Sequence, residues 1–177
     1  MNLELMDIFR MEYDFSWDTE TWFLPLESAL KGLNSKDASW QPPGGGNTIW
    51  QTVNHLNYYN TLLVRQINGI TPRKKASNSK DTYGDIGEPE SEEWKEILAE
   101  DTFGNVGDPA DSEKWKAALA ETRLICGDLR KSLAQVNDSR LEEEHVGRMA
   151  RQILHNVYHI GQIVLIRKQQ GSWPKER

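Results

Sequence analysis

Two histidines near the C-terminus have the spacing of a metal-binding pair. His155 and His159 lie four residues apart within residues 154–163, a segment whose other residues are typical of a buried helix. Positions i and i+4 of a helix share one face, so both imidazoles would point the same way. Two neutral imidazoles held in parallel can converge on one ion without bending the backbone. The spacing therefore predicts half of a metal site, and a further ligand must come from elsewhere in the chain.

A third histidine lies in a second predicted helix. Apolar residues recur at helical spacing after Asn47 or Thr48, either of which can cap the helix, and His55 lies beside this apolar stripe. In a helical bundle, His55 could reach His155 and His159 across the interior. Three histidines with an open fourth position form the arrangement of a catalytic metal site, whereas structural sites are usually closed by four protein ligands. Imidazole ligands suit zinc, nickel, iron or copper without choosing among them.

The histidines also have a purely structural explanation. A lone His55 requires no ligand, and an i,i+4 pair is by itself a weak signal, because three ligands meet only if the tertiary fold brings them together. His145 follows an acidic run in a predicted loop, has no histidine at helical spacing, and is predicted to lie at the surface. The single cysteine, Cys126, excludes an internal disulfide and a cysteine-based zinc cage, and its apolar neighbours predict a packed side chain.

Four helices are predicted to position these residues. Pro25 is expected to bend the first helix or to divide it into two short collinear helices, with Trp22 on the apolar stripe. Residues 157–166 are apolar almost all round, which predicts a last helix with neighbours on several sides. No segment alternates convincingly as a strand, so the predicted fold class is an all-α four-helix bundle, with residues 1–177 as one domain. The predicted helices cover residues 3–33, 47–69, 112–136 and 148–170.

The connection between the second and third helices is long. Residues 70–110 are rich in Gly, Pro, Ser, Asp and Lys, and a short helix is predicted over residues 91–100. Residues 81–89, DTYGDIGEP, return as residues 101–109, DTFGNVGDP. Two copies are too few for a solenoid, so they indicate a local duplication. A connection of this length in a compact domain is more often functional, or a cover over a site, than idle.

Composition and charge restrict the partners. The chain has 177 residues and a formal net charge of −6, and it has no Lys/Arg stripe with interleaved aromatic residues. This balance argues against nucleic acid or an anionic membrane surface as a partner. No apolar stretch approaches the roughly 18 residues of a membrane span, and the N-terminal residues carry no signal-peptide pattern. We expect a soluble, cytoplasmic protein.

Several motifs together resemble a known family. The Asn-His-Leu triplet around His55 and the His-x3-His-x-Gly-Gln-Ile run that starts at His155 are similar to the DinB-like superfamily, which includes the DinB proteins and the YfiT-type thiol transferases. A Pro-x-Gly run at Pro42 and Gly69 at the end of the second helix add to the resemblance. The resemblance implies an up-down-down-up bundle, a homodimer, and a divalent metal, with zinc or nickel favoured, bound by His55, His155 and His159.

Two kinds of function follow from this resemblance. The first is a metal-dependent enzyme with a small-molecule substrate, either a transferase that uses a low-molecular-weight thiol or a hydrolase whose metal lowers the pKa of water toward about 7. The alternative is a non-catalytic metal-binding protein that acts in stress response or as a dimeric interaction module. The connection over residues 70–110 departs from the shorter family members, so the resemblance does not define the substrate pocket. By position alone, the polar candidates for that pocket, of which only the acids could serve as general base, are Gln162, Tyr58, Tyr59, Glu12, Asp14 and Asp18.

Overall fold

The computed structural model describes residues 4–68, 102–137, 139, 141 and 143–174. Within these residues the chain forms helices and no strand, which confirms the predicted all-α class. The short helix predicted over residues 91–100 and the first copy of the repeat lie outside the described residues. The helices are α1 (Leu5–Trp17), α2 (Leu26–Leu30), α3 (Ser35–Ala38), α4 (Ile49–Ile67), α6 (Ser112–Gln135) and α7 (Glu143–Gln170).

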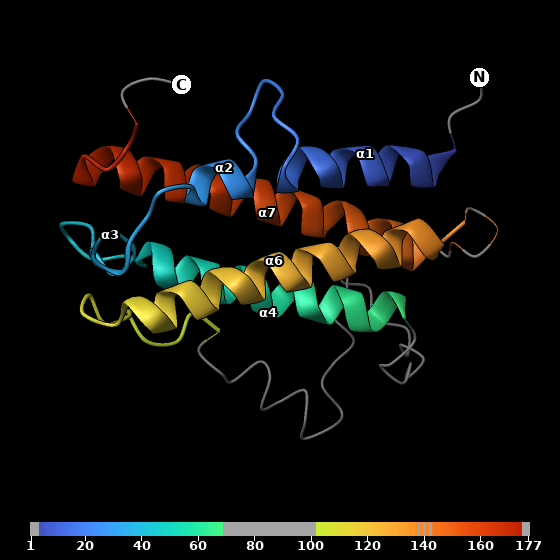
Figure 1. The fold of residues 1–177 in the computed structure, drawn as a ribbon. Helices are drawn as coiled ribbons and strands as arrows, with labels where there is room; N and C mark the ends of the chain where they lie inside the picture. Colours follow the sequence, from blue (N-terminus) through green and yellow to red (C-terminus); the bar gives the residue numbers. More distant parts are fainter. Residues whose placement is uncertain (1–3, 69–101, 138, 140, 142, 175–177) are drawn as a thin grey trace.

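The long helices follow the up-down-down-up order that the family resemblance implies. In Figure 1, α1 and α2 run in one direction along the bundle, α4 and α6 both run in the opposite direction, and α7 returns. Because α4 and α6 run the same way, the chain between them must travel back along the length of the bundle. A tight turn cannot make this connection, and the order of the helices therefore requires a long one.

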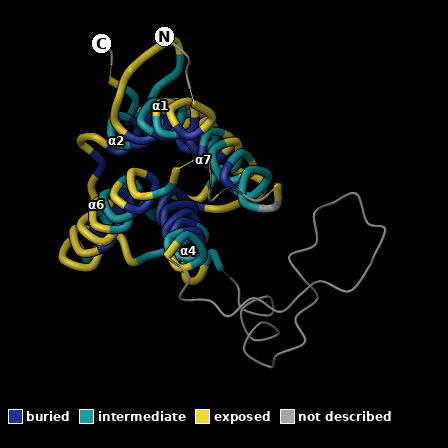
Figure 2. The backbone as a smooth tube through the Cα atoms, turned by 90° about the vertical axis from the view of Figure 1, so that its right-hand side faces the viewer, coloured by how far each residue is buried: buried dark blue, intermediate teal, exposed yellow. Residues whose placement is uncertain are grey.

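The four long helices surround one apolar core. α4 packs on both α6 and α7, and α1 packs on the same two helices, so α1 and α4 lie diagonally opposite each other. Viewed along the bundle, the buried positions of each helix face the centre (Figure 2). The side chains in this core with the least exposure are Met6, Ala29, Ala38, Ile49, Val53, Leu56, Leu129 and Ile163.

The segment of the first predicted helix forms two separate helices, which was one of the two predicted alternatives. α1 ends at Trp17 and α2 begins at Leu26, and Figure 1 shows them end to end with a loop between. Pro25 is the residue that precedes the first turn of α2, where its missing N–H costs no hydrogen bond. The assignment of Trp22 to the core was wrong, because this residue lies in the connecting loop and its exposed fraction is 97 %.

Helix α7 corrects the sequence prediction in two ways. It begins at Glu143 rather than near residue 148, which places His145 in the first helical turn instead of in a loop. Its predicted apolar segment also has an exposed side, because Leu154, Tyr158 and Leu165 are each more than half exposed. These three residues, with Gly161 between them, follow one outward stripe of the helix at i, i+4, i+7 and i+11.

The start of α4 is fixed by a reciprocal cap. The Thr48 hydroxyl accepts a hydrogen bond from the Gln51 N–H at 3.1 Å, and Gln51 Oε1 accepts one from the Thr48 N–H at 3.0 Å. This is a capping box, which satisfies two backbone donors that the first turn leaves unpaired. The same hydroxyl donates to the Val106 carbonyl at 3.1 Å, so the cap also binds the segment that precedes α6.

Replacing Thr48 by Ala should lower the free energy of unfolding by about 1–2 kcal/mol, because the variant loses the cap and the bond to Val106. Urea unfolding monitored by circular dichroism measures this change. Thr48→Ser keeps the hydroxyl and should cost less than Thr48→Ala. An equal loss in both variants would show that the hydroxyl bonds contribute nothing.

Candidate metal centre

The packing of α4 against α7 brings the three predicted histidines together. α4 supplies His55, and one face of α7 supplies His155 and His159, which lie one turn apart as the i,i+4 spacing predicts. The Nε2 atoms of His55 and His159 each lie 3.0 Å from Nε2 of His155. One ligand atom of each residue lies within 4.8 Å of the others, so the cluster could hold a metal ion. His145, the fourth histidine, lies outside it.

The donor set fits a divalent ion. His55 and His159 are buried and His155 is half-buried. Lone pairs of three imidazoles directed at one point repel one another unless a proton or a cation lies between them. Two nitrogens bound at 2.0–2.1 Å to a tetrahedral zinc would lie about 3.3 Å apart, which is close to the 3.0 Å that separates Nε2 of His155 from Nε2 of His55 and of His159. Among the described residues, no carboxylate and no thiolate joins the cluster.

Hydrogen bonds to the outer nitrogens orient two of the rings. Nδ1 of His159 lies 2.7 Å from Oε1 of Gln162, and Nδ1 of His55 lies 2.7 Å from the hydroxyl of Thr102. The Gln162 oxygen can only accept, so Nδ1 of His159 carries the proton and Nε2 presents a lone pair to the cluster. Gln162, one of the polar candidates for the pocket, therefore lies beside the cluster and orients the ring of His159.

His155 has a different neighbour, a buried amide network. Nε2 of Gln152 lies 3.5 Å from Nδ1 of His155, which is long for a hydrogen bond, and 3.0 Å from the side-chain oxygens of both Asn60 and Asn156. Asn156 Nδ2 also donates to Asn60 at 3.1 Å. The network links α4 to α7 directly beside the cluster. The network holds the Gln152 amide in place, and this amide limits how far the His155 ring can move on that side.

Aromatic rings surround the cluster. Phe103 stacks on His55 with a centroid distance of 4.0 Å and an angle of 7° between the planes. Tyr59 presents its ring edge-on to His55 at 4.8 Å and to His155 at 5.0 Å, and Tyr158 does the same to His159 at 5.1 Å. These apolar surfaces exclude water from the imidazoles and lower the local dielectric constant, which strengthens electrostatic interactions there.

This environment favours the neutral form of His155 and His159. Burial, with the neighbouring His159 and His55 as smaller causes, lowers the pKa of His155 to about 4. Burial also lowers the pKa of His159, against a smaller opposing effect of the Gln162 hydrogen bond. Neutral imidazole is the form that binds a metal, so protons compete weakly with an ion at neutral pH.

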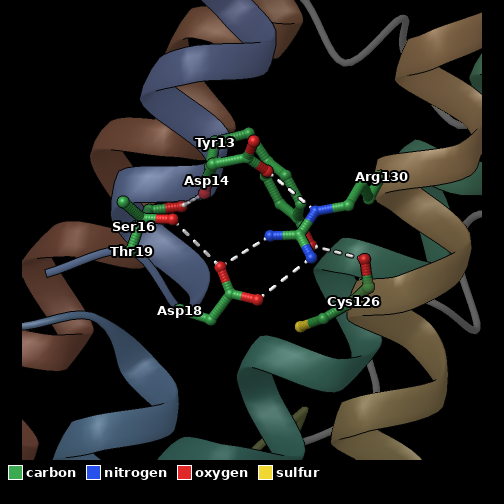
Figure 3. Close-up of polar contacts among 7 residues, drawn as sticks. All are labelled: Tyr13, Asp14, Ser16, Asp18, Thr19, Cys126 and Arg130. Carbon is green, nitrogen blue, oxygen red and sulfur yellow. Dashed lines mark hydrogen bonds and ion pairs between the residues drawn. The ribbon is translucent and has the colours of Figure 1, made fainter.

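Two of the three acidic residues proposed by position as general bases, Asp14 and Asp18, are engaged elsewhere. Arg130 of α6 donates to Asp14 at 2.8 Å and to both carboxylate oxygens of Asp18 at 3.0 and 2.7 Å (Figure 3). The hydrogen bonds from Arg130 lower the pKa of Asp18 and so make it a weaker base. These residues tie α1 to α6, the side of the bundle that does not carry the histidines. Glu12 is half-buried on α1.

Cys126 is a packed core residue, as its apolar neighbours predict. Its side chain is buried, and burial raises the pKa of the thiol to about 12. The hydroxyl of Tyr13 donates to the backbone carbonyl of the same residue at 2.8 Å (Figure 3). A thiol that remains protonated and covered at neutral pH cannot serve as a nucleophile.

Two residues of the site were not found from the sequence. Thr102 and Phe103 both contact His55 and come from the segment just before α6. The repeat offered a signal, because its two copies share Asp-Thr-aromatic-Gly at their start. Spacing alone could not connect this motif to His55, since 47 residues separate Thr102 from it.

A family comparison agrees with this geometry. A sequence model of the DinB superfamily matches residues 25–166, which include all three histidines. The chain therefore belongs to the DinB superfamily. No curated protein and no solved structure matches it.

The pKa of His155 predicts how the stability of the metal-free protein depends on pH. An unfolded histidine has a pKa near 6.5, so between about 6.5 and 4 the unfolded chain binds a proton that folded His155 does not. Stability from this group is therefore complete above pH 6.5 and is lost as the pH falls toward 4. The difference in unfolding free energy between wild type and His155→Gln should shrink over this window. Urea titrations at several pH values measure it, and a pH-independent difference would contradict the low pKa.

Proposed function

We propose that this protein binds one divalent metal ion through His55, His155 and His159, with zinc or nickel as the ion, and that it uses the ion in catalysis on a small molecule. The observation that carries the proposal is the convergence of three Nε2 atoms, with those of His55 and His159 each 3.0 Å from that of His155, without a fourth protein ligand among the described residues. Three imidazoles with an open position are typical of catalytic rather than structural zinc sites.

A divalent ion in such a site supplies Lewis acidity that lowers the pKa of a water or thiol ligand toward neutrality. The residues of the chain would bind the ion and orient the imidazole rings that hold it. Gln162 keeps the lone pair of His159 directed at the centre, and Tyr59 and Tyr158 shield the imidazoles from water. The described part of the chain brings no carboxylate into the histidine cluster, so a reaction there would rely on the ion and on the substrate's own acid–base groups.

Transfer of a low-molecular-weight thiol is the form of the reaction that we favour, with hydrolysis as the second form. The buried, protonated Cys126 cannot supply a thiolate, which supports an external thiol as the nucleophile. A cytoplasmic location is part of the proposal, because small thiols are kept reduced there. The alternative is a metal-binding protein without catalysis, in stress response or as a dimeric interaction module. It shares the ligand set and differs only in turnover.

Metal content tests the ligand set. Purified wild-type protein should carry about one equivalent of divalent ion per chain, as one three-ligand site requires, and His55→Ala and His155→Ala should lose it. His145→Ala is the matched control, because this histidine lines a separate cavity of about 290 Å³ near the end of α4 and should leave the metal content unchanged. Elemental analysis measures all four proteins. Metal retained in both ligand variants would exclude the assignment.

Activity separates the enzyme from the binding protein. With metal bound, wild type should turn over substrates in a panel of thiol-transfer and hydrolysis reactions, and His159→Ala should not. If the loaded wild type shows no metal-dependent turnover while its metal content is stoichiometric, the non-catalytic alternative is favoured.

We also propose that the protein forms a homodimer through the outward stripe of α7. The stripe consists of Leu154, Tyr158, Gly161 and Leu165. Three large apolar side chains on one helix face favour a protein contact over solvent. Gly161 between them supports close approach of a second helix, since no atom of the described chain lies within 4 Å of a Cβ placed there.

A charge in this stripe should convert the dimer to a monomer. Leu165→Lys is expected to shift the mass measured by light scattering from two chains to one, because an unpaired charge would be buried in the contact. Leu124→Lys is the control, since Leu124 is equally a leucine more than half exposed but lies on α6. A monomeric wild type, or equal effects of the two variants, would contradict the proposed interface.

A further inference from the structure

The segment that precedes α6 lies along α4 and reaches the histidine cluster. It places Thr102 at the outer nitrogen of His55 and Phe103 flat against the same ring. Phe103 also lies 6.1 Å from the ring of His159. His55 therefore receives its outer contacts from a part of the chain that is neither α4 nor α7.

Side-chain hydrogen bonds to its backbone carbonyls hold this segment in register. Gln51 Nε2 donates to the Gly104 carbonyl at 2.9 Å, and the Thr48 hydroxyl donates to the Val106 carbonyl at 3.1 Å. Both donors belong to the capping box at the start of α4, the helix that carries His55. The residues that start α4 thus also determine where Thr102 lies relative to His55.

A close approach farther along the segment requires glycine. Gly107 has a φ of +86°, and a Cβ on it would lie 2.5 Å from the ring of Trp50. Any other residue would be strained in the backbone and would collide with a ring that is itself packed against Trp115 at 5.2 Å. The segment is therefore held at both ends, by His55 at one and by Trp50 at the other.

We propose that Thr102 is a positioning residue that selects the tautomer of His55. Nδ1 of the ring lies 2.7 Å from the Thr102 hydroxyl, and when this hydroxyl accepts the Nδ1–H, the lone pair is left on Nε2, the atom that faces His155. The parallel Phe103 ring, 4.0 Å away, restrains the imidazole plane in which that lone pair lies. Gln162 does the same for His159 from within α7, whereas His55 depends on a residue distant in the sequence.

The effect of Thr102 on metal affinity rests on the proposed function, whereas its effect on the tautomer of His55 is independent of that function. Removing a hydrogen-bond partner from a metal-binding histidine typically lowers metal affinity by about 10–100-fold. Without the hydroxyl, the ring of His55 loses the hydrogen bond that favours a proton on Nδ1, and a proton on Nε2 must be removed or moved before an ion can bind. The effect therefore appears first in the metal-free protein.

Three variants test the proposal. Thr102→Val keeps the shape and removes the hydroxyl, and Thr102→Ser keeps the hydroxyl. Thr82→Val makes the same change at the matching residue of the first repeat copy. Long-range ¹H–¹⁵N NMR of metal-free protein at pH 8 reports which nitrogen of His55 is protonated, and Zn²⁺ competition with a chromogenic chelator reports affinity. Thermal unfolding confirms that each variant is folded.

We expect Nδ1–H in wild type, Thr102→Ser and Thr82→Val, and loss of this preference in Thr102→Val, together with about 10–100-fold weaker Zn²⁺ binding in that variant alone. An unchanged tautomer in Thr102→Val, no rescue by serine, or an equal effect of Thr82→Val would overturn the inference. If wild type shows the expected tautomer but binds no Zn²⁺, the proposed function fails and the role of Thr102 in selecting the tautomer stands.

Discussion

The structure depends on the contact between α4 and α7, two antiparallel helices that lie side by side in the bundle. This contact buries imidazoles whose inner nitrogens lie 3.0 Å apart, an arrangement that is unfavourable unless a proton or a cation is shared between them. The apolar core that includes Leu56 and Ile163 supplies the packing free energy that holds the helices together. The polar link from Gln152 and Asn156 to Asn60 then sets the register between them.

The outer contacts of the three histidines differ in origin. His159 is oriented by Gln162, three residues along the same helix, so helix geometry alone maintains that contact. His155 faces an amide network shared by two helices. His55 is oriented by a residue that follows the long connection, and the parallel course of α4 and α6 makes that connection necessary. The topology of the bundle and the orientation of one histidine are therefore linked.

Ionisable groups are distributed unevenly over the bundle. Between α1 and α6, Arg130 neutralises two carboxylates, and nearby Cys126 is held as a neutral thiol. Between α4 and α7, the described residues bring three imidazoles together, and burial favours the neutral form of His155 and His159. Charge is compensated on one side, while the other side offers lone pairs without a counterion. Such a site is suited to a cation that arrives with its own exchangeable ligand.

The sequence by itself determined the all-α class, the central parts of the long helices and the pairing of His155 with His159, because these depend on periodicity within a single segment. The break at Pro25 and the cap at Thr48 could also be predicted from the sequence, since each residue changes the hydrogen bonding of the backbone beside it. Only the tertiary structure decided that His55 joins the pair, that Asp14 and Asp18 serve Arg130 instead, and that one stripe of α7 is exposed. It alone placed Thr102 on His55. These outcomes depend on which helices are neighbours, and no local pattern specifies how a helix face is matched to a partner distant in the chain.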